Sequence, residues 1–119
     1  MKTKEITVCG RQVVLAYCFA TELVFKKFTS LEIEDFDPTN RDHIIYMILS
    51  AIAAYYESQE KEEDRKAPIV DTDLMYHAKP KEIVAALQEI TKLKAEWYEI
   101  PNGDKIEEKP ADSEESKNA

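Results

Sequence analysis

Cysteine, histidine and paired carboxylates are the residue types in this chain that could act in catalysis or bind a metal. A nucleophilic pair would need Cys18 beside His43 or His77, and such contact in space does not follow from their spacing. No second ligand follows either histidine at the spacing of a zinc site. Carboxylates occur in runs such as residues 57–64, which is typical of a solvated surface rather than a buried acid–base pair. The residues therefore favour a protein that is not an enzyme and that holds no metal or cofactor.

Glycine content and charge exclude two further classes of site. Phosphate-binding and dinucleotide-binding loops need closely spaced glycines, because the backbone must approach the phosphates, and this chain has only Gly10 and Gly103. The formal net charge is −8, and lysines are intermixed with glutamates along most of the chain. Surfaces that bind nucleic acid generally carry a basic patch, so no nucleic-acid partner is expected.

Length and composition indicate one small domain built mainly from helices. The chain has 119 residues, of which 44% are apolar, and this is enough for a modest core. Two glycines and five prolines argue against a fold with many turns. No run of about 18 apolar residues occurs, so no membrane span is expected. The amino terminus lacks the apolar stretch of a signal peptide, so we expect a cytoplasmic protein.

The elements that must position the side chains begin with a β-hairpin over residues 5–18. Gly10 and Arg11 are the expected turn residues, because a type II′ turn prefers glycine at its first central position. Val8 then faces Val13 across the hairpin. A lone hairpin is only marginally stable in water, so helices or another subunit must cover its apolar face. That face is formed by Ile6, Val8, Val13, Leu15 and Tyr17.

Two helices are predicted next. The pattern over residues 19–28 indicates a short amphipathic helix. Residues 43–56 are apolar on nearly every side, which is typical of a helix at the centre of a fold or one covered by a partner. The buried stripe expected for the first helix consists of Ala20, Leu23, Val24 and Phe28.

The carboxyl-terminal part is predicted as two helices and a tail. A short helix begins near Asp71, and a longer helix begins at Pro80, which suits the first turn of a helix. Residues 104–119 contain six carboxylates, three lysines and only one large apolar side chain, so ordering them would not bury enough apolar surface. We therefore expect an α+β, mostly helical fold: a hairpin packed on three to four helices over residues 1–100, followed by a disordered acidic tail over residues 101–119.

Apolar and aromatic side chains on the later helices are the candidates for contact with another protein. A helix that is apolar all round exceeds what a few short elements can cover, which suits self-association or partner binding. Tryptophan and tyrosine are also enriched at binding hot spots. The alternative is that these side chains complete the core. The candidate contact residues are Tyr55, Tyr56, Ile83, Leu87, Ile90, Trp97 and Tyr98.

The opening segment resembles that of the phage and prophage tail assembly chaperones. These proteins often begin with an apolar strand, a glycine-containing turn and a second apolar strand, as residues 5–17 do here. A helix and a break at Thr29-Ser30 follow, with serine in place of the family's usual glycine. The resemblance continues as a pattern to residue 98, through an acidic helix start at residues 71–74 and the Pro-Lys-Glu-Ile-Val segment at residues 80–84.

The resemblance implies a non-enzymatic chaperone of tail assembly in the host bacterial cytoplasm. Such a protein binds the long tape measure protein and keeps it soluble while the tail is built. It also implies tail tube subunits as further partners, and a longer product made by ribosomal frameshifting in many members of the family. Two alternatives stay open on the residues alone: a small dimeric adaptor or inhibitor of another protein, and an acidic mimic of DNA.

Overall fold

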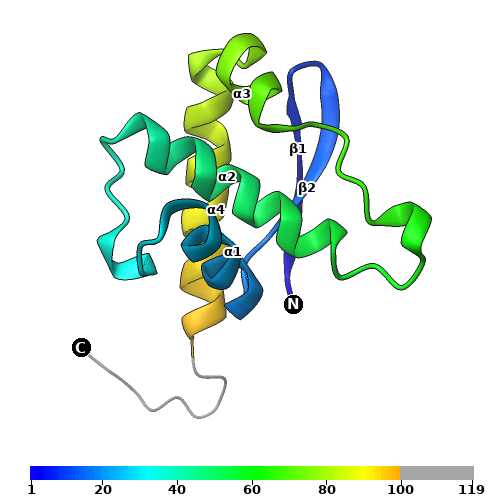
Figure 1. Ribbon diagram of the computed structural model, residues 1–119, viewed down its shortest axis with the longest axis horizontal. Coiled ribbons are helices and arrows are strands. Elements are labelled where there is room, and N and C mark those ends of the chain that lie inside the picture. Colours follow the sequence, from blue (N-terminus) through cyan, green and yellow to red (C-terminus); the bar gives the residue numbers. More distant parts are fainter. Residues whose placement is uncertain (100–119) are drawn as a thin grey trace.

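The computed structural model describes residues 1–99 and confirms the α+β, mostly helical fold with an amino-terminal hairpin packed on helices (Figure 1). The predicted tail over residues 101–119 and the domain's last residue, 100, lie outside the described residues. No helix within residues 1–99 has the length and apolar character needed to cross a membrane. In chain order the elements are β1 Thr3–Val8, β2 Arg11–Ala16, α1 Phe19–Thr29, α2 Arg41–Tyr56, α3 Asp71–His77 and α4 Pro80–Tyr98, with short 3-10 turns at Ile33–Asp35 and Glu62–Asp64.

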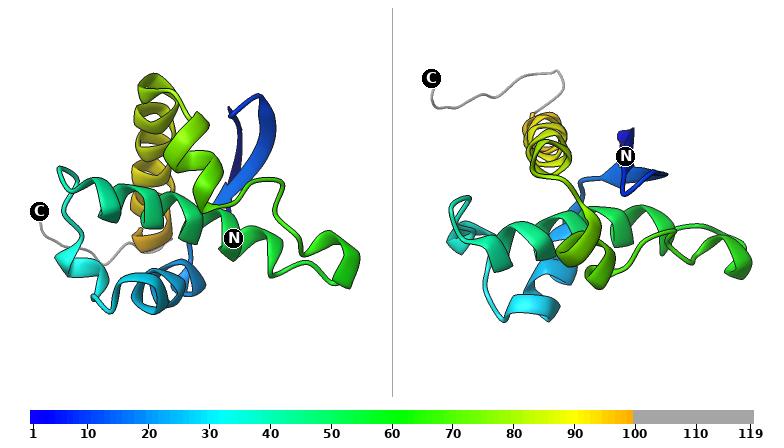
Figure 2. Two further views of the ribbon diagram at one scale, coloured as in Figure 1. Left: turned by 45° about the horizontal axis from the view of Figure 1, so that its top comes forward. Right: turned by 90° about the horizontal axis from the view of Figure 1, so that it is seen from above.

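Helix α2 runs through the middle of the molecule, as its apolar surface predicts. The hairpin and α4 lie side by side on one side of it, and α1 packs on the other (Figure 2). Because both sides are covered, α2 buries an unbroken run over residues 47–52, which extends around the whole helix in its middle turns. Met47, Ile48, Ala51, Ile52 and Ala54 are each no more than 3% exposed.

The hairpin turns one residue earlier than predicted. Cys9 and Gly10 are the turn residues, with φ of 56° and 73°, and Val8 pairs with Arg11 instead of Val13. Positive φ at both positions is what a type I′ turn requires, and glycine is then favoured second rather than first. A non-glycine residue in this conformation is strained. Two contacts from distant residues compensate at Cys9: its N–H donates to Glu82 Oε1 (3.4 Å) and its thiol donates to the Asp73 carbonyl (3.3 Å).

The predicted register was therefore wrong by two residues, but the predicted apolar face is confirmed. Side chains alternate between faces along a strand, so a shift of two leaves each residue on its original face. Val8, Val13, Leu15 and Tyr17 are all at most 1% exposed, and Ile6 is half-buried against the same core. The face is covered by α2 and α4.

The predicted buried stripe of α1 was wrong. The helix buries Thr21 and Phe25, whereas Leu23 is 62% exposed. The cause lies in the Thr21 hydroxyl, which donates to the Ala16 carbonyl (3.0 Å) and accepts from the Cys18 N–H (3.1 Å). These bonds fix Thr21 toward the end of β2, and Phe25 follows one turn later on the same side. Leu23 consequently points away from the core.

Candidate protein-binding groove

An apolar groove lies between the first turns of α2, the short helix α3 and the first turns of α4. Its volume is about 600 Å³. Arg41 and Asp42 lie at one end of the groove, at the start of α2. The other lining residues are Ile44, Ile45, Tyr46, Leu74, Met75, Ala78, Pro80, Ile83 and Val84. The groove is thus a predominantly apolar surface contributed by three helices.

The groove exists because the first turns of α2 are less covered by the rest of the domain than its later turns. Asn40 caps the helix, its side-chain oxygen accepting from the His43 N–H (3.2 Å). Ile44 and Ile45, one turn into the helix, are only half-buried, whereas Ile48 and Ile52 further along are at most 1% exposed. The sequence thus places isoleucines at positions that the domain itself leaves partly uncovered.

The break between α3 and α4 forms the opposite wall. Pro80 is the first residue of α4, and the residue before a proline is kept out of the helical conformation, so Lys79 is extended. The Glu82 carboxylate accepts from the Lys79 N–H (2.9 Å) and from the Cys9 N–H, which holds the start of α4 against the hairpin turn. These hydrogen bonds, chiefly that from Lys79, lower the pKa of Glu82.

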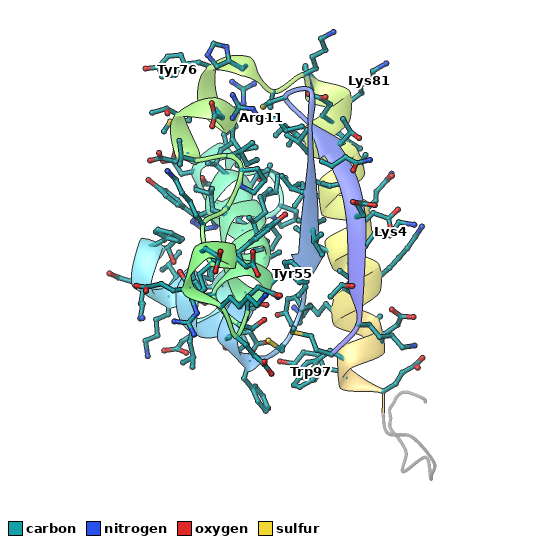
Figure 3. All side chains as sticks on the ribbon, turned by 90° about the vertical axis from the view of Figure 1, so that its right-hand side faces the viewer. Lys4, Arg11, Tyr55, Tyr76, Lys81 and Trp97 are labelled. Carbon is teal, nitrogen blue, oxygen red and sulfur yellow. The ribbon has the colours of Figure 1, made fainter. Side chains whose placement is uncertain are left out.

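Arg11 fixes α3 from the hairpin side. Its guanidinium donates to the Pro68 carbonyl (2.9 Å) and lies 3.4 Å from an Asp73 carboxylate oxygen, which also accepts from the Val70 N–H (2.8 Å). Figure 3 shows Arg11 between the hairpin turn and α3, with Tyr76 directed outward from α3. The wall carrying Met75 is therefore tied to the rest of the fold at several points.

Two residues give the groove its open apolar surface. Met75 is 51% exposed and Val84 is 53% exposed. A second depression of about 580 Å³ continues from Val84 along α4, over Leu87, Gln88, Thr91 and Lys92. The apolar surface is therefore elongated, and it follows α4 for about three turns.

The structure separates the seven candidate contact residues into different regions. Ile83 lines the groove and Leu87 lines its continuation along α4. Ile90 is 3% exposed and belongs to the core. Tyr55 and Tyr56 lie half-buried at the far end of α2, with ring centroids 4.8 Å apart. The Tyr56 phenol oxygen accepts from the Val14 N–H (3.2 Å) and so supports the hairpin.

Trp97 and Tyr98 lie at the last turn of α4, beside α1. Trp97 is half-buried, and its ring meets Phe19 edge to face with centroids 5.3 Å apart. Tyr98 is 52% exposed and donates to the Glu22 carboxylate, which also accepts from Tyr17 (2.7 Å). Desolvation, reinforced by the Glu22 bond, raises the pKa of Tyr98 to about 12 and raises that of Tyr17 as well. An unperturbed tyrosine is already protonated at neutral pH, so these shifts extend the donor role of the two phenols to more alkaline pH.

Among residues 1–99, no three histidine, cysteine or carboxylate side chains are grouped so that they could hold a metal ion.

No protein-family model, curated protein or solved structure matches this chain.

Met75 and Val84, the two exposed large apolar residues that line the groove, are absent from the contact residues predicted from the sequence. Val84 belongs to the apolar stripe predicted for α4, and periodicity alone does not say which members of a stripe stay uncovered. Met75 carried no comparable signal. Its exposure depends on where α3 packs, and α3 has only seven residues, too few for a periodic pattern to define a face.

Proposed function

We propose that this protein is a non-enzymatic phage tail assembly chaperone that holds an apolar helix of the tape measure protein in the groove between α2, α3 and α4. The observation that carries this proposal is the open apolar groove, with Met75 and Val84 about half exposed. Contiguous exposed apolar surface on a small domain is typical of a site for another protein. The sequence resemblance supplies the identity of the client.

The size of the groove suits a helix as occupant. The groove and its continuation follow α4 from Pro80 to Lys92, roughly 18 Å at the rise of an α-helix. About three turns of a client helix would fit along this length, with apolar anchors at positions i, i+3 or i+4, and i+7. Leucine, isoleucine or valine anchors would contact Ile45, Met75 and Val84.

The composition of the groove suits a client whose helices differ in sequence. Methionine is flexible and polarizable, so Met75 can adapt to side chains of different shape. The net charge of −8 disfavours aggregation when apolar segments are bound. Both properties are those expected of a chaperone that coats a long apolar protein in the host cytoplasm before tail tube subunits arrive.

Co-expression tests this function in the cell. A helical, apolar fragment of the tape measure protein encoded by the same phage or prophage should move from the insoluble to the soluble fraction when this protein is present. The two chains should also co-purify, because the client's apolar face is held in the groove instead of aggregating. A lysate expressing an unrelated acidic protein of similar size is the control.

An unchanged soluble fraction, with this protein itself abundant and folded, would count against the proposal.

A further inference from the structure

The hairpin has one covered edge and one open edge. On β2 the outer edge is covered, because the Val14 N–H donates to the Tyr56 phenol oxygen (3.2 Å) and the Ala16 carbonyl accepts from the Thr21 hydroxyl (3.0 Å). The sheet has only two strands within residues 1–99, so no further strand pairs with β1 there. Figure 2 shows the hairpin at the outside of the molecule, and it is β2 that packs on α2.

The contacts of β2 also identify the backbone groups of β1 that point outward. In an antiparallel pair, opposed residues alternate between bonding to each other and directing both backbone groups away from each other. Val14 and Ala16 direct theirs away, and the residues opposite them in the register are Glu5 and Thr3. By the same alternation, Thr7 joins Glu5 and Thr3. The N–H and C=O of these three residues therefore form the open edge, six groups in all.

The chemistry of this edge matches an extended polypeptide. Thr3, Glu5 and Thr7 are exposed, and none of their outward groups bonds to the backbone of another residue within 1–99. Figure 3 shows Lys4, which lies between them in sequence, at the margin of the molecule on the side away from Tyr55. Donors and acceptors alternate along the edge at the spacing of a strand, so an added strand can bond to all of them.

Charge makes a second copy of this chain a poor match for the edge. In a two-fold dimer, β1 would pair antiparallel with the β1 of the other copy. The register that pairs all six groups places Glu5 opposite Glu5 and Lys4 opposite Ile6. Like charges directly opposite each other destabilise a sheet, and both copies carry a net charge of −8. The edge is therefore better suited to a different chain.

Glu5 and Ile6 indicate which side chains such a partner needs. Glu5 is exposed, and no lysine or arginine within residues 1–99 forms an ion pair with it. A basic side chain directly opposite Glu5 would supply that charge. Ile6 is half-buried against the core, so an apolar side chain opposite it would cover its remaining surface.

We infer that β1 binds an extended segment of another protein as a third strand, with a lysine or arginine opposite Glu5 and an apolar residue opposite Ile6. The added strand is antiparallel to β1, which is the more stable pairing per residue. The groove between α2, α3 and α4 contains no residue of β1, so the two sites are separate. The inference does not depend on the identity of the client that the groove binds.

Two cyclic β-hairpin peptides test the charge of the partner. One presents Thr-Val-Lys-Thr-Thr on its free edge, so that valine lies opposite Ile6 and lysine opposite Glu5, and the other has glutamate in place of the lysine. Cyclisation removes most of the cost of ordering the strand. In nuclear magnetic resonance titrations, the full-length wild type should bind the lysine peptide at least about fivefold more tightly than the glutamate peptide. Glu5→Lys should reverse this preference.

Glu5→Pro tests the role of the backbone edge. Proline removes the N–H of residue 5, which faces away from β2, so the hydrogen bonds within the hairpin are retained. This variant should bind the lysine peptide at least about tenfold more weakly than Glu5→Val, the matched control, which loses the charge but keeps the N–H. Hydrogen exchange at the Thr3 and Thr7 amides should slow when the lysine peptide binds to the wild type. Circular dichroism verifies that both variants are folded.

Four results would overturn the inference. The first is a wild type that binds neither peptide at millimolar concentration, or both with equal affinity. The second is undiminished binding by a folded Glu5→Pro variant. The third is a wild-type dimer that Glu5→Pro converts to a monomer, because a second copy would then occupy the edge. The fourth is slow exchange at Thr3 and Thr7 in the free chain that becomes fast when residues 100–119 are removed, because the chain's own carboxyl-terminal segment would then pair with β1.

Discussion

Val84→Asp should weaken the binding of an apolar tape measure helix by at least about tenfold. The Val84 side chain is 53% exposed and lines both the groove and its continuation along α4, so a docked helix would bury it. A carboxylate buried against apolar side chains without a partner loses its hydration at a cost of several kcal/mol. Each 1.4 kcal/mol lost corresponds to about tenfold in affinity. Fluorescence anisotropy with a labelled client peptide measures the change.

Ala85→Asp is the matched control for this experiment. It introduces the same carboxylate at the next position of the same helix, where the side chain is exposed outside the groove. The affinity of the Ala85→Asp variant for the peptide should stay within about twofold of the wild-type affinity. Such a change corresponds to the few tenths of a kcal/mol that are typical of a surface substitution. Equal losses in the two variants would show that general charge repulsion, rather than the groove, governs binding.

Phe25→Ala should lower the free energy of unfolding by about 3–5 kcal/mol, the cost typical of truncating a buried aromatic side chain. Phe25 is fully buried and packs edge to face against Phe36, with ring centroids 5.9 Å apart, and against His43, at 6.2 Å. Removing the ring would leave a cavity beneath the start of α2. Chemical denaturation followed by circular dichroism measures the change.

Leu23→Ala tests which face of α1 is buried. The structure leaves Leu23 exposed, whereas the sequence pattern predicts that it is buried. Leu23 is 62% exposed, so in the monomer this truncation should change the free energy of unfolding by no more than about 0.5 kcal/mol. Measurement at low protein concentration keeps self-association out of the comparison. If Leu23→Ala destabilised the chain as much as Phe25→Ala, α1 would be rotated from the orientation described above.

These two α1 variants show where sequence reasoning about the fold succeeds and where it fails. The positions of the helices follow from capping residues, prolines and apolar content, which are local properties. The face that α1 buries does not follow from local properties, because a polar residue, Thr21, is fully buried there. Two backbone groups satisfy the hydrogen bonds that the Thr21 hydroxyl would otherwise make with water, so the residue can be buried. A hydrophobicity scale that counts threonine as polar does not predict this.

The hairpin turn illustrates the same limit. The alternation of side chains defined the apolar face, and a shift of two residues could not alter it. The turn type depended on whether Cys9 could adopt a positive φ. It does so where Glu82 and Asp73 reach the turn from far along the chain. No short-range pattern contains that information.

The candidate site was predictable only in part, for a related reason. Periodicity identifies the apolar side of a helix, and it placed Ile83, Leu87 and Ile90 together on α4. It does not say which of them a second element covers. The hairpin and α2 both pack on α4, so Ile90 is buried while Ile83 and Leu87 border the groove.

The proposed binding site for a client helix is the groove between α2, α3 and α4. The most direct measurement is a nuclear magnetic resonance titration of the methyl-labelled protein with an apolar helical peptide from the tape measure protein. The methyl signals of Ile45, Met75 and Val84 should shift together and saturate, while those of Leu23 and Ile69 stay in place. Shifts confined to other regions, or none at a saturating concentration of peptide, would contradict the claim.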